Sequence, residues 1–121
     1  MLKKLLLTFS VVILFFSNFS LSKADLLIPN NSILPAEVIK IQLTALMNND
    51  KEFEDSGIEQ TWKFAHPDNK KNTGPLPNFK MMIKGNSYQM LLNHISHTIT
   101  ELGSSDNWAQ FDIHRYNFVS L

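Results

Sequence analysis

Histidines are the first candidates for chemistry in this sequence, because three of the four, His66, His94 and His97, could together bind a metal ion. His94 and His97 are three residues apart, a spacing that would bring their rings together on a helix. The sequence here changes to the alternating pattern of a strand, in which an odd spacing directs side chains to opposite faces. We therefore expect no metal site and no cofactor. We interpret His66 as a cation near the C-terminal end of a helix and His94 as a buried hydrogen-bonding group.

Asp55 and Glu59 are four residues apart and could form a carboxylate pair for general acid–base catalysis. The same pair would straddle the start of a helix, where the helix dipole favours negative charge, and we prefer this capping role. No nucleophile lies in a glycine-flanked elbow. The lack of cysteine excludes disulfides, a thiolate metal site and a cysteine nucleophile.

Aromatic and apolar residues in the middle of the chain are candidates for a ligand pocket. Such pockets are mostly apolar, with a few polar groups that orient the ligand. The alternative is plain core packing, for which a small domain also needs its aromatic residues. We take as candidate ligand-binding residues Trp62, Phe79, Tyr88 and His94, and Phe64 and Met82 could lie beside them.

The framework for these side chains begins with residues 35–65, which predict two helices joined by an acidic turn. Pro35 suits the first turn of a helix, and Glu37 places a negative charge near the positive end of the dipole. Apolar residues then recur at helical spacing and predict one buried face, made of Val38, Ile41, Ala45 and Leu46. After a polar loop over residues 49–57, the second helix presents a face made of Ile58, Trp62 and Ala65.

The rest of the chain predicts a loop, a short helix and a β-hairpin. Residues 66–77 contain three prolines, a glycine and two lysines, which is typical of a surface loop. Residues 79–84 predict a short helical turn that ends at Gly85, and residues 87–94 add core material. Residues 95–101 and 108–113 alternate with a period of two, which predicts a hairpin with a turn over 103–107.

The first 24 residues are typical of a secretory signal peptide. Lys3 and Lys4 precede an uncharged apolar run, and small residues stand at the two positions that a signal peptidase reads, Ser22 and Ala24. The alternative is an uncleaved anchor, since the seventeen uncharged residues 5–21 are at the low edge of a span of roughly 17–25. We therefore expect export to the periplasm, the thylakoid lumen or the medium. A leader would follow over residues 25–34, and a single α+β domain over residues 35–121.

The charge of the mature chain limits its partners. Cleavage after Ala24 removes three of the 11 basic residues and none of the 11 acidic ones, which leaves a net charge of about −3. Nucleic acid and anionic membrane surfaces do not attract a mildly acidic chain. We expect no nucleic-acid partner, and membrane contact only through an uncleaved signal segment.

An ordered series of short motifs over residues 35–102 resembles the family called domain of unknown function 4864, which is found in bacteria, cyanobacteria and plants. The motifs are PAEVIKIQLTALMNND, DSGIEQTWKFAHPDNKKNTGP, FKMMI and YQMLLNH. The resemblance implies a cystatin-like cone of the nuclear transport factor 2-like, or SnoaL-like, superfamily. In this fold the N-terminal helices pack on a curved antiparallel sheet. The resemblance implies no established activity.

The C-terminus departs from the family's pattern. Relatives continue after the first hairpin with further strands, whereas this chain ends at Leu121 after HRYNFVSL. We expect a truncated or frameshifted version with an incomplete sheet. The unpaired edge would invite pairing with another chain, including a second copy, and a two-stranded hairpin is marginal without further cover.

The sequence thus favours a non-catalytic module outside the cytoplasmic membrane that binds a small ligand or a protein. One alternative is an enzyme of the isomerase or dehydratase type, with His94 paired to Asp55 or Tyr88 in a cone pocket. Only analogy of fold supports that activity, and a fold does not determine function. A further alternative is an inactive truncated gene product.

Overall fold

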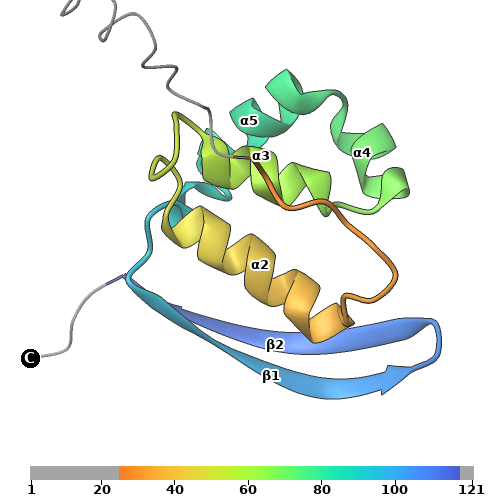
Figure 1. The fold of residues 1–121 in the computed structure, drawn as a ribbon. Coiled ribbons are helices and arrows are strands. Elements are labelled where there is room, and N and C mark those ends of the chain that lie inside the picture. Colours follow the sequence, from red (N-terminus) through yellow and green to blue (C-terminus); the bar gives the residue numbers. More distant parts are fainter. Residues whose placement is uncertain (1–24, 118–121) are drawn as a thin grey trace, which may run out of the picture.

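The computed structural model describes residues 25–117, which form an α+β domain with four α-helices and a two-stranded antiparallel sheet (Figure 1). With the labels of Figure 1, the helices are α2 (Pro35–Met47), α3 (Ser56–Lys63), α4 (Pro67–Thr73) and α5 (Leu76–Lys84). A 3-10 helix, η1 (Gln89–Leu91), precedes the strands β1 (Ser96–Ser105) and β2 (Trp108–Tyr116). The α+β class is confirmed, and the predicted signal peptide lies outside the described residues.

Helix α2 occupies the middle of the structure. It lies between the hairpin on one side and the group of α3, α4 and α5 on the other (Figure 1). The predicted leader, residues 25–34, passes in front of α3 and then turns back to the start of α2. Pro35 stands in the first turn of α2, as the sequence predicts.

The approach of α3 to α2 depends on Gly57, near the start of α3. A Cβ at this position would lie 2.1 Å from the carbonyl oxygen of Ala45 and 2.8 Å from the Cα of Asn49. The Gly57 N–H donates to the Asn49 carbonyl oxygen at 2.8 Å. The two helices therefore meet backbone to backbone, which a larger residue would prevent.

The hydrophobic core lies among the helices. Its fully buried centre is Ile58, and its buried members are Leu46, Ile58, Phe79 and Ile83. Partly buried hydrophobic residues pack around them, namely Trp62, Met82, Leu91 and Leu92. Burying one such aliphatic side chain stabilises the fold by about 1.5–3 kcal/mol.

The segment predicted as a surface loop, residues 66–77, contains helix α4, so that prediction was wrong. Pro67 starts the helix, and the His66 ring accepts a hydrogen bond from the Asp68 N–H at 3.2 Å. His66 therefore caps the start of α4, and its predicted role at the C-terminal end of the preceding helix was wrong. All residues of α4 after Pro67 are polar, so no apolar periodicity signals the helix. Gly74, in a left-handed conformation at φ 79°, ends it.

Helix α5 starts at Leu76, three residues before the predicted helical turn, and it ends at Lys84 as predicted, with Gly85 at the C-cap. Its buried residues Phe79 and Ile83 belong to the core. The following segment, residues 87–94, contributes Leu91 and Leu92 to the edge of the core. Tyr88 does not contribute, because it is 43% exposed.

The hairpin is confirmed, with longer strands and a shorter turn than predicted. Ile99 pairs with Ile113, and the register continues to Ser105 and Trp108 at the turn. The register shifts by one residue between Glu101 and Gly103, so Leu102 forms a β-bulge in β1. Gly103 therefore belongs to the strand and not to the turn.

Candidate functional site

The hairpin is the most open element of the described structure. Within residues 25–117 the sheet contains only β1 and β2, so each strand leaves one row of backbone N–H and C=O groups without a strand neighbour. Such an edge is a template for pairing with another polypeptide. A hairpin with only two strands is also marginally stable unless another element covers it.

Large hydrophobic side chains are exposed along this hairpin and at its start. They are Ile95, Leu102, Trp108, Ile113 and Tyr116, each 40–61% exposed. The hairpin therefore combines unpaired backbone with apolar side chains that a partner could cover.

The two edges of the sheet are not equivalent. Helix α2 packs against β1, so β1 is the better-covered strand. The bulge at Leu102 interrupts β1, and a bulge hinders pairing along an edge. Strand β2 has no extra residue in any of its nine positions. The β2 edge is thus the more regular and more accessible of the two.

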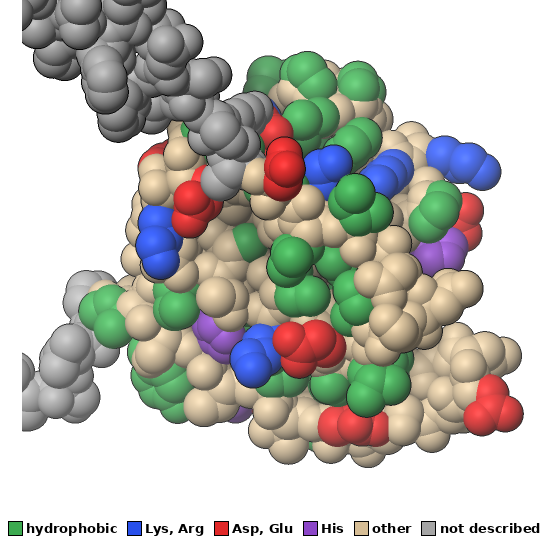
Figure 2. All heavy atoms as spheres, viewed as in Figure 1, with side chains coloured by type: hydrophobic (Ala, Val, Ile, Leu, Met, Phe, Trp, Pro, Cys, Tyr) green, Lys and Arg blue, Asp and Glu red, His purple; other side chains and the backbone are tan. Residues whose placement is uncertain are grey.

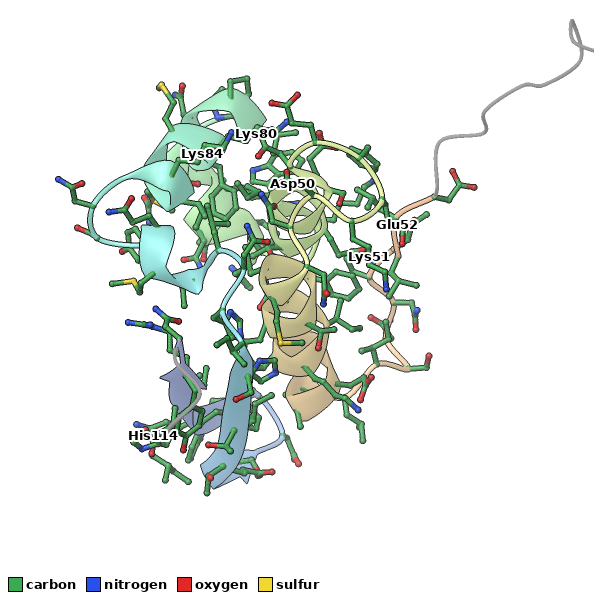
Figure 3. The ribbon with its side chains drawn as sticks, turned by 90° about the vertical axis from the view of Figure 1, so that its left-hand side faces the viewer. Asp50, Lys51, Glu52, Lys80, Lys84 and His114 are labelled. Carbon is green, nitrogen blue, oxygen red and sulfur yellow. The ribbon has the colours of Figure 1, made fainter. Side chains whose placement is uncertain are left out.

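The side chains of β2 divide between two faces. Ala109, Phe111 and Arg115 are half-buried on the face that turns toward α2. Asp112 and His114 are exposed on the outer face, where the His114 Nε2 lies 3.3 Å from a carboxylate oxygen of Asp112. Figure 3 shows His114 on the side of the hairpin away from α2.

The prediction that His94 and His97 point to opposite faces was wrong. The His94 Nε2 lies 2.8 Å from the His97 Nδ1, and the ring centroids are 5.0 Å apart. The reason is that β1 starts only at Ser96, and Asn93 turns the chain with a left-handed φ of 55° just before His94. Among the described residues, no group of three or more His, Cys, Asp or Glu side chains could hold a metal ion.

His94 is a buried hydrogen-bonding group, as predicted. It is 3% exposed, and its Nδ1 lies 2.7 Å from the carbonyl oxygen of Leu91. Because a carbonyl oxygen only accepts, the His94 Nδ1 carries the proton of this bond. Burial lowers the pKa of His97, and the neighbouring His94 lowers it further. The two rings therefore hold the start of the hairpin against η1 as a hydrogen-bonded pair.

Asn49 organises the turn between α2 and α3. Its side-chain oxygen accepts from the Ile58 N–H at 3.0 Å, and its backbone oxygen accepts from the Ser56 hydroxyl at 2.7 Å. Asn49 is 3% exposed, and its side chain caps α3 although it lies several residues before the helix. Asp55 holds the N-cap position but makes no side-chain capping bond, so its predicted capping role was wrong.

Asp55 and Glu59 instead form ion pairs with α5. The Lys84 Nζ lies 2.7 Å from Asp55, and the Lys80 Nζ lies 2.9 Å from Glu59. Figure 3 shows both lysines on α5 beside the turn that carries Asp50. Burial alone would raise the pKa of Asp55, but hydrogen bonds from Lys84 and Asn49 and the charges of both lysines together hold it below its usual range.

The four predicted ligand-binding residues lie in different surroundings. Phe79 belongs to the core, and Trp62 packs against that core with the Lys70 ammonium 4.3 Å from its ring centroid. Tyr88 is largely exposed, and His94 is buried beside the hairpin. None of the four lines the hollow between the leader, α2 and α3.

That hollow has a volume of about 350 Å³. Its outer wall is the leader, where the Leu27 N–H donates to the Gln60 side-chain oxygen at 2.7 Å. The Gln60 amide in turn donates to the Leu27 carbonyl oxygen at 3.0 Å. Its apolar lining comes from Leu26, Leu27, Ile41 and Ala45, and charged residues also line it, namely Glu37, Lys40, Lys51 and Glu52. Figure 2 shows hydrophobic side chains gathered across this face, with charged groups around them.

Comparison of the chain with protein-family models, with curated proteins and with solved structures gave no match. The resemblance to the family called domain of unknown function 4864 therefore stays a prediction. No helix within residues 25–117 is long and apolar enough to cross a membrane.

Proposed function

We propose that this chain is a non-catalytic protein-binding module whose hairpin takes up a β-strand from a partner. The observation that carries the proposal is the two-stranded sheet with a regular, accessible β2 edge. A third strand would satisfy the free backbone groups of β2 and would cover the exposed side chain of Ile113. Strand addition of this kind draws its affinity from main-chain hydrogen bonds and its specificity from alternate side chains.

The contacts of the candidate acid–base residues favour a binding role over an enzymatic one. Both nitrogens of His94 lie at hydrogen-bonding distance from other groups, the Leu91 carbonyl oxygen and His97. Asp55 forms a close ion pair with Lys84. An isomerase or dehydratase needs an acid and a base that converge on a substrate, and the arrangement of these residues lends that activity no support.

The finer expectations from the sequence belong to the same proposal. We infer a nuclear transport factor 2-like cone with an incomplete sheet, supported by the position of α2 across the hairpin. We also infer export by cleavage after Ala24, supported by the basic, apolar and small-residue pattern of residues 1–24. A module of this kind would meet its partner outside the cytoplasmic membrane.

The binding of a synthetic strand tests the proposed function. The probe is a fluorescein-labelled peptide with the sequence of residues 108–116, WAQFDIHRY, titrated with the full chain and followed by fluorescence anisotropy. We expect saturable binding, and no binding of a control peptide in which the same residues are shuffled. Equal behaviour of the two peptides would contradict strand addition.

The hollow beneath the leader favours a second candidate function, the binding of a small amphipathic ligand. Its volume of about 350 Å³ and mostly apolar lining are within the usual range for ligand sites. The probe is the dye anilinonaphthalene sulfonate, whose fluorescence rises in apolar surroundings. Thr44→Tyr should fill the hollow and abolish the rise, whereas Thr98→Tyr, on the outer face of β1, should not. Equal fluorescence of both variants would exclude this site.

A further inference from the structure

We propose that the partner of the hairpin is a second copy of this chain, joined antiparallel through β2, with Ile113 facing Ile113 across a two-fold axis. The inference rests on the proposed function and names the strand that the β2 edge accepts. It follows from the charges along β2, from the exposure of Ile113 and from the bulge in β1.

The polar side chains of β2 complement themselves in this register, with opposite charges wherever His114 is protonated. When Ile113 lies on the axis, Asp112 faces His114 of the partner subunit, and this pair occurs twice. Asp112 and His114 already lie 3.3 Å apart within one chain, so the four side chains would form one alternating cluster on the outer face. On the inner face, Phe111 would face Arg115 of the partner subunit. Opposite charges and cation–aromatic pairs across strands are stabilising.

Neighbouring registers lack this complementarity. If Asp112 lay on the axis, it would face Asp112 of the partner subunit, and like charges directly opposite each other are destabilising. If Phe111 lay on the axis, Asp112 would face Gln110 of the partner subunit and His114 would face Trp108 of the partner subunit. Asp112 and His114 would then no longer face each other across the interface. These two registers slide the β2 strands past each other by two and four residues, and side-chain chemistry disfavours both.

The resulting sheet would have four strands in the order β1, β2, partner β2, partner β1. An axis perpendicular to the sheet keeps both copies of α2 on the same face, so the two helices would flank the central pair of strands. Ile113, which is 40% exposed in one chain, would lie at the centre of that face between them. A four-stranded sheet with a helix layer on one side relieves the marginal stability of an isolated hairpin.

The same arrangement explains why pairing would stop at two copies. The outer edges of the four-stranded sheet would be the two β1 strands, each interrupted by the bulge at Leu102. Bulged edges resist the addition of further strands. A self-complementary interface between identical surfaces also closes by its own symmetry and leaves no open end.

Single cysteines test the register directly, because the natural chain contains none. In the proposed pairing, Ile113→Cys places two thiols across the axis, where opposite Cα atoms of antiparallel strands lie about 4.5–5.5 Å apart, within disulfide range. The matched controls are Ile99→Cys, at the position paired with Ile113 in the hairpin, and Asp112→Cys, one residue away. Under mild oxidation of the full chain, we expect Ile113→Cys to form disulfide-linked dimers at least tenfold faster than either control.

Every other outcome overturns the proposal. Faster cross-linking of Ile99→Cys would assign the interface to β1, and faster cross-linking of Asp112→Cys would shift the register. No cross-linking of any variant, with a far-ultraviolet spectrum that matches the natural chain, would exclude the homodimer. If the chain still binds the synthetic β2 peptide, strand addition stands and only the second copy is wrong. If it does not, both proposals fail.

A charge exchange gives an independent test of the same pairs. Asp112→Arg should remove both Asp112–His114 pairs from the interface and weaken dimerisation by about tenfold, as measured by analytical ultracentrifugation. The double variant Asp112→Arg, His114→Asp restores opposite charges in the proposed register and should recover the natural affinity. A double variant as weak as the single one would contradict the facing of these two residues.

Discussion

Replacement of Gly57 by alanine should destabilise the protein strongly, because this residue sets the distance between α2 and α3. The new Cβ would lie 2.1 Å from the Ala45 carbonyl oxygen, whereas ordinary contacts begin at 3.4 Å. The helices would therefore have to separate locally by about 1.3 Å, the difference between these two distances. That shift would also stretch the hydrogen bond from the Gly57 N–H to the Asn49 carbonyl oxygen, now 2.8 Å.

The expected loss of stability follows from three terms. Overpacking of this severity costs about 3 kcal/mol, and the stretched hydrogen bond costs about 1 kcal/mol. Alanine gains about 1 kcal/mol over glycine in a helix, which leaves a net loss of roughly 3 kcal/mol. For a domain of this size, each kcal/mol lowers the melting temperature by about 4–8 °C, so we expect a fall of roughly 12–24 °C.

Thermal unfolding followed by circular dichroism measures this fall, with Gly85→Ala as the matched control. Gly85 has an ordinary φ of −75°, and a Cβ there would lie 3.2 Å from the nearest atom, the Met82 carbonyl oxygen. The control should melt within a few degrees of the natural chain. If Gly57→Ala melted as little changed as Gly85→Ala, the close packing of α2 on α3 would be refuted.

Three further predictions concern the polar contacts that hold the helices and the leader. Asn49→Ala should lower the free energy of unfolding by about 1–3 kcal/mol in urea titrations, because α3 loses its cap, whereas the exposed Asn48→Ala should cost little. The pKa of Asp55 is lower in the folded state than its unfolded value near 4. The ion pair of Asp55 therefore stabilises the fold fully above pH 4, and this contribution is lost as the pH falls from there through the lowered pKa. Lys84→Met should therefore flatten the decline of the urea midpoint between pH 6 and pH 3, and an unchanged decline would exclude this pair as its source. Gln60→Ala should speed hydrogen exchange at the Leu27 amide, measured by NMR, and an unchanged rate would show that Gln60 does not hold the leader.

Local sequence patterns predicted the elements that have apolar periodicity. The apolar spacing after Pro35 predicted α2, and the alternation around Ile99 and Phe111 predicted the hairpin. Helix α4 escaped prediction because its residues after Pro67 are all polar, so only the capping signals of His66 and Gly74 mark it. Those signals are equally typical of a loop rich in proline and glycine.

Contacts between residues distant in sequence could not be predicted from local patterns. Asn49 caps α3 from outside the helix, nine residues before the Ile58 N–H that it accepts from. The local sequence places Asn49 in a turn but does not indicate this capping role. The reciprocal bonds between Gln60 and Leu27 join residues 33 positions apart. The meeting of His94 and His97 depends on the left-handed turn at Asn93, which the alternating pattern conceals. The alternating pattern predicted which residues share a face of the hairpin. It did not predict the bulge that distinguishes the two edges, which appears only in the residue pairing of β1 with β2.

Hydrogen exchange of the β2 amides over a dilution series of the full chain, read by mass spectrometry, tests the pairing of two β2 strands without any substitution. We expect exchange across β2, including Ile113, to slow as the concentration rises, because a second β2 covers the free edge. Exchange in β1 should change less, because its outer edge stays open in the proposed sheet. Exchange of β2 that is independent of concentration, or slowing confined to β1, would rule out a dimer joined through β2.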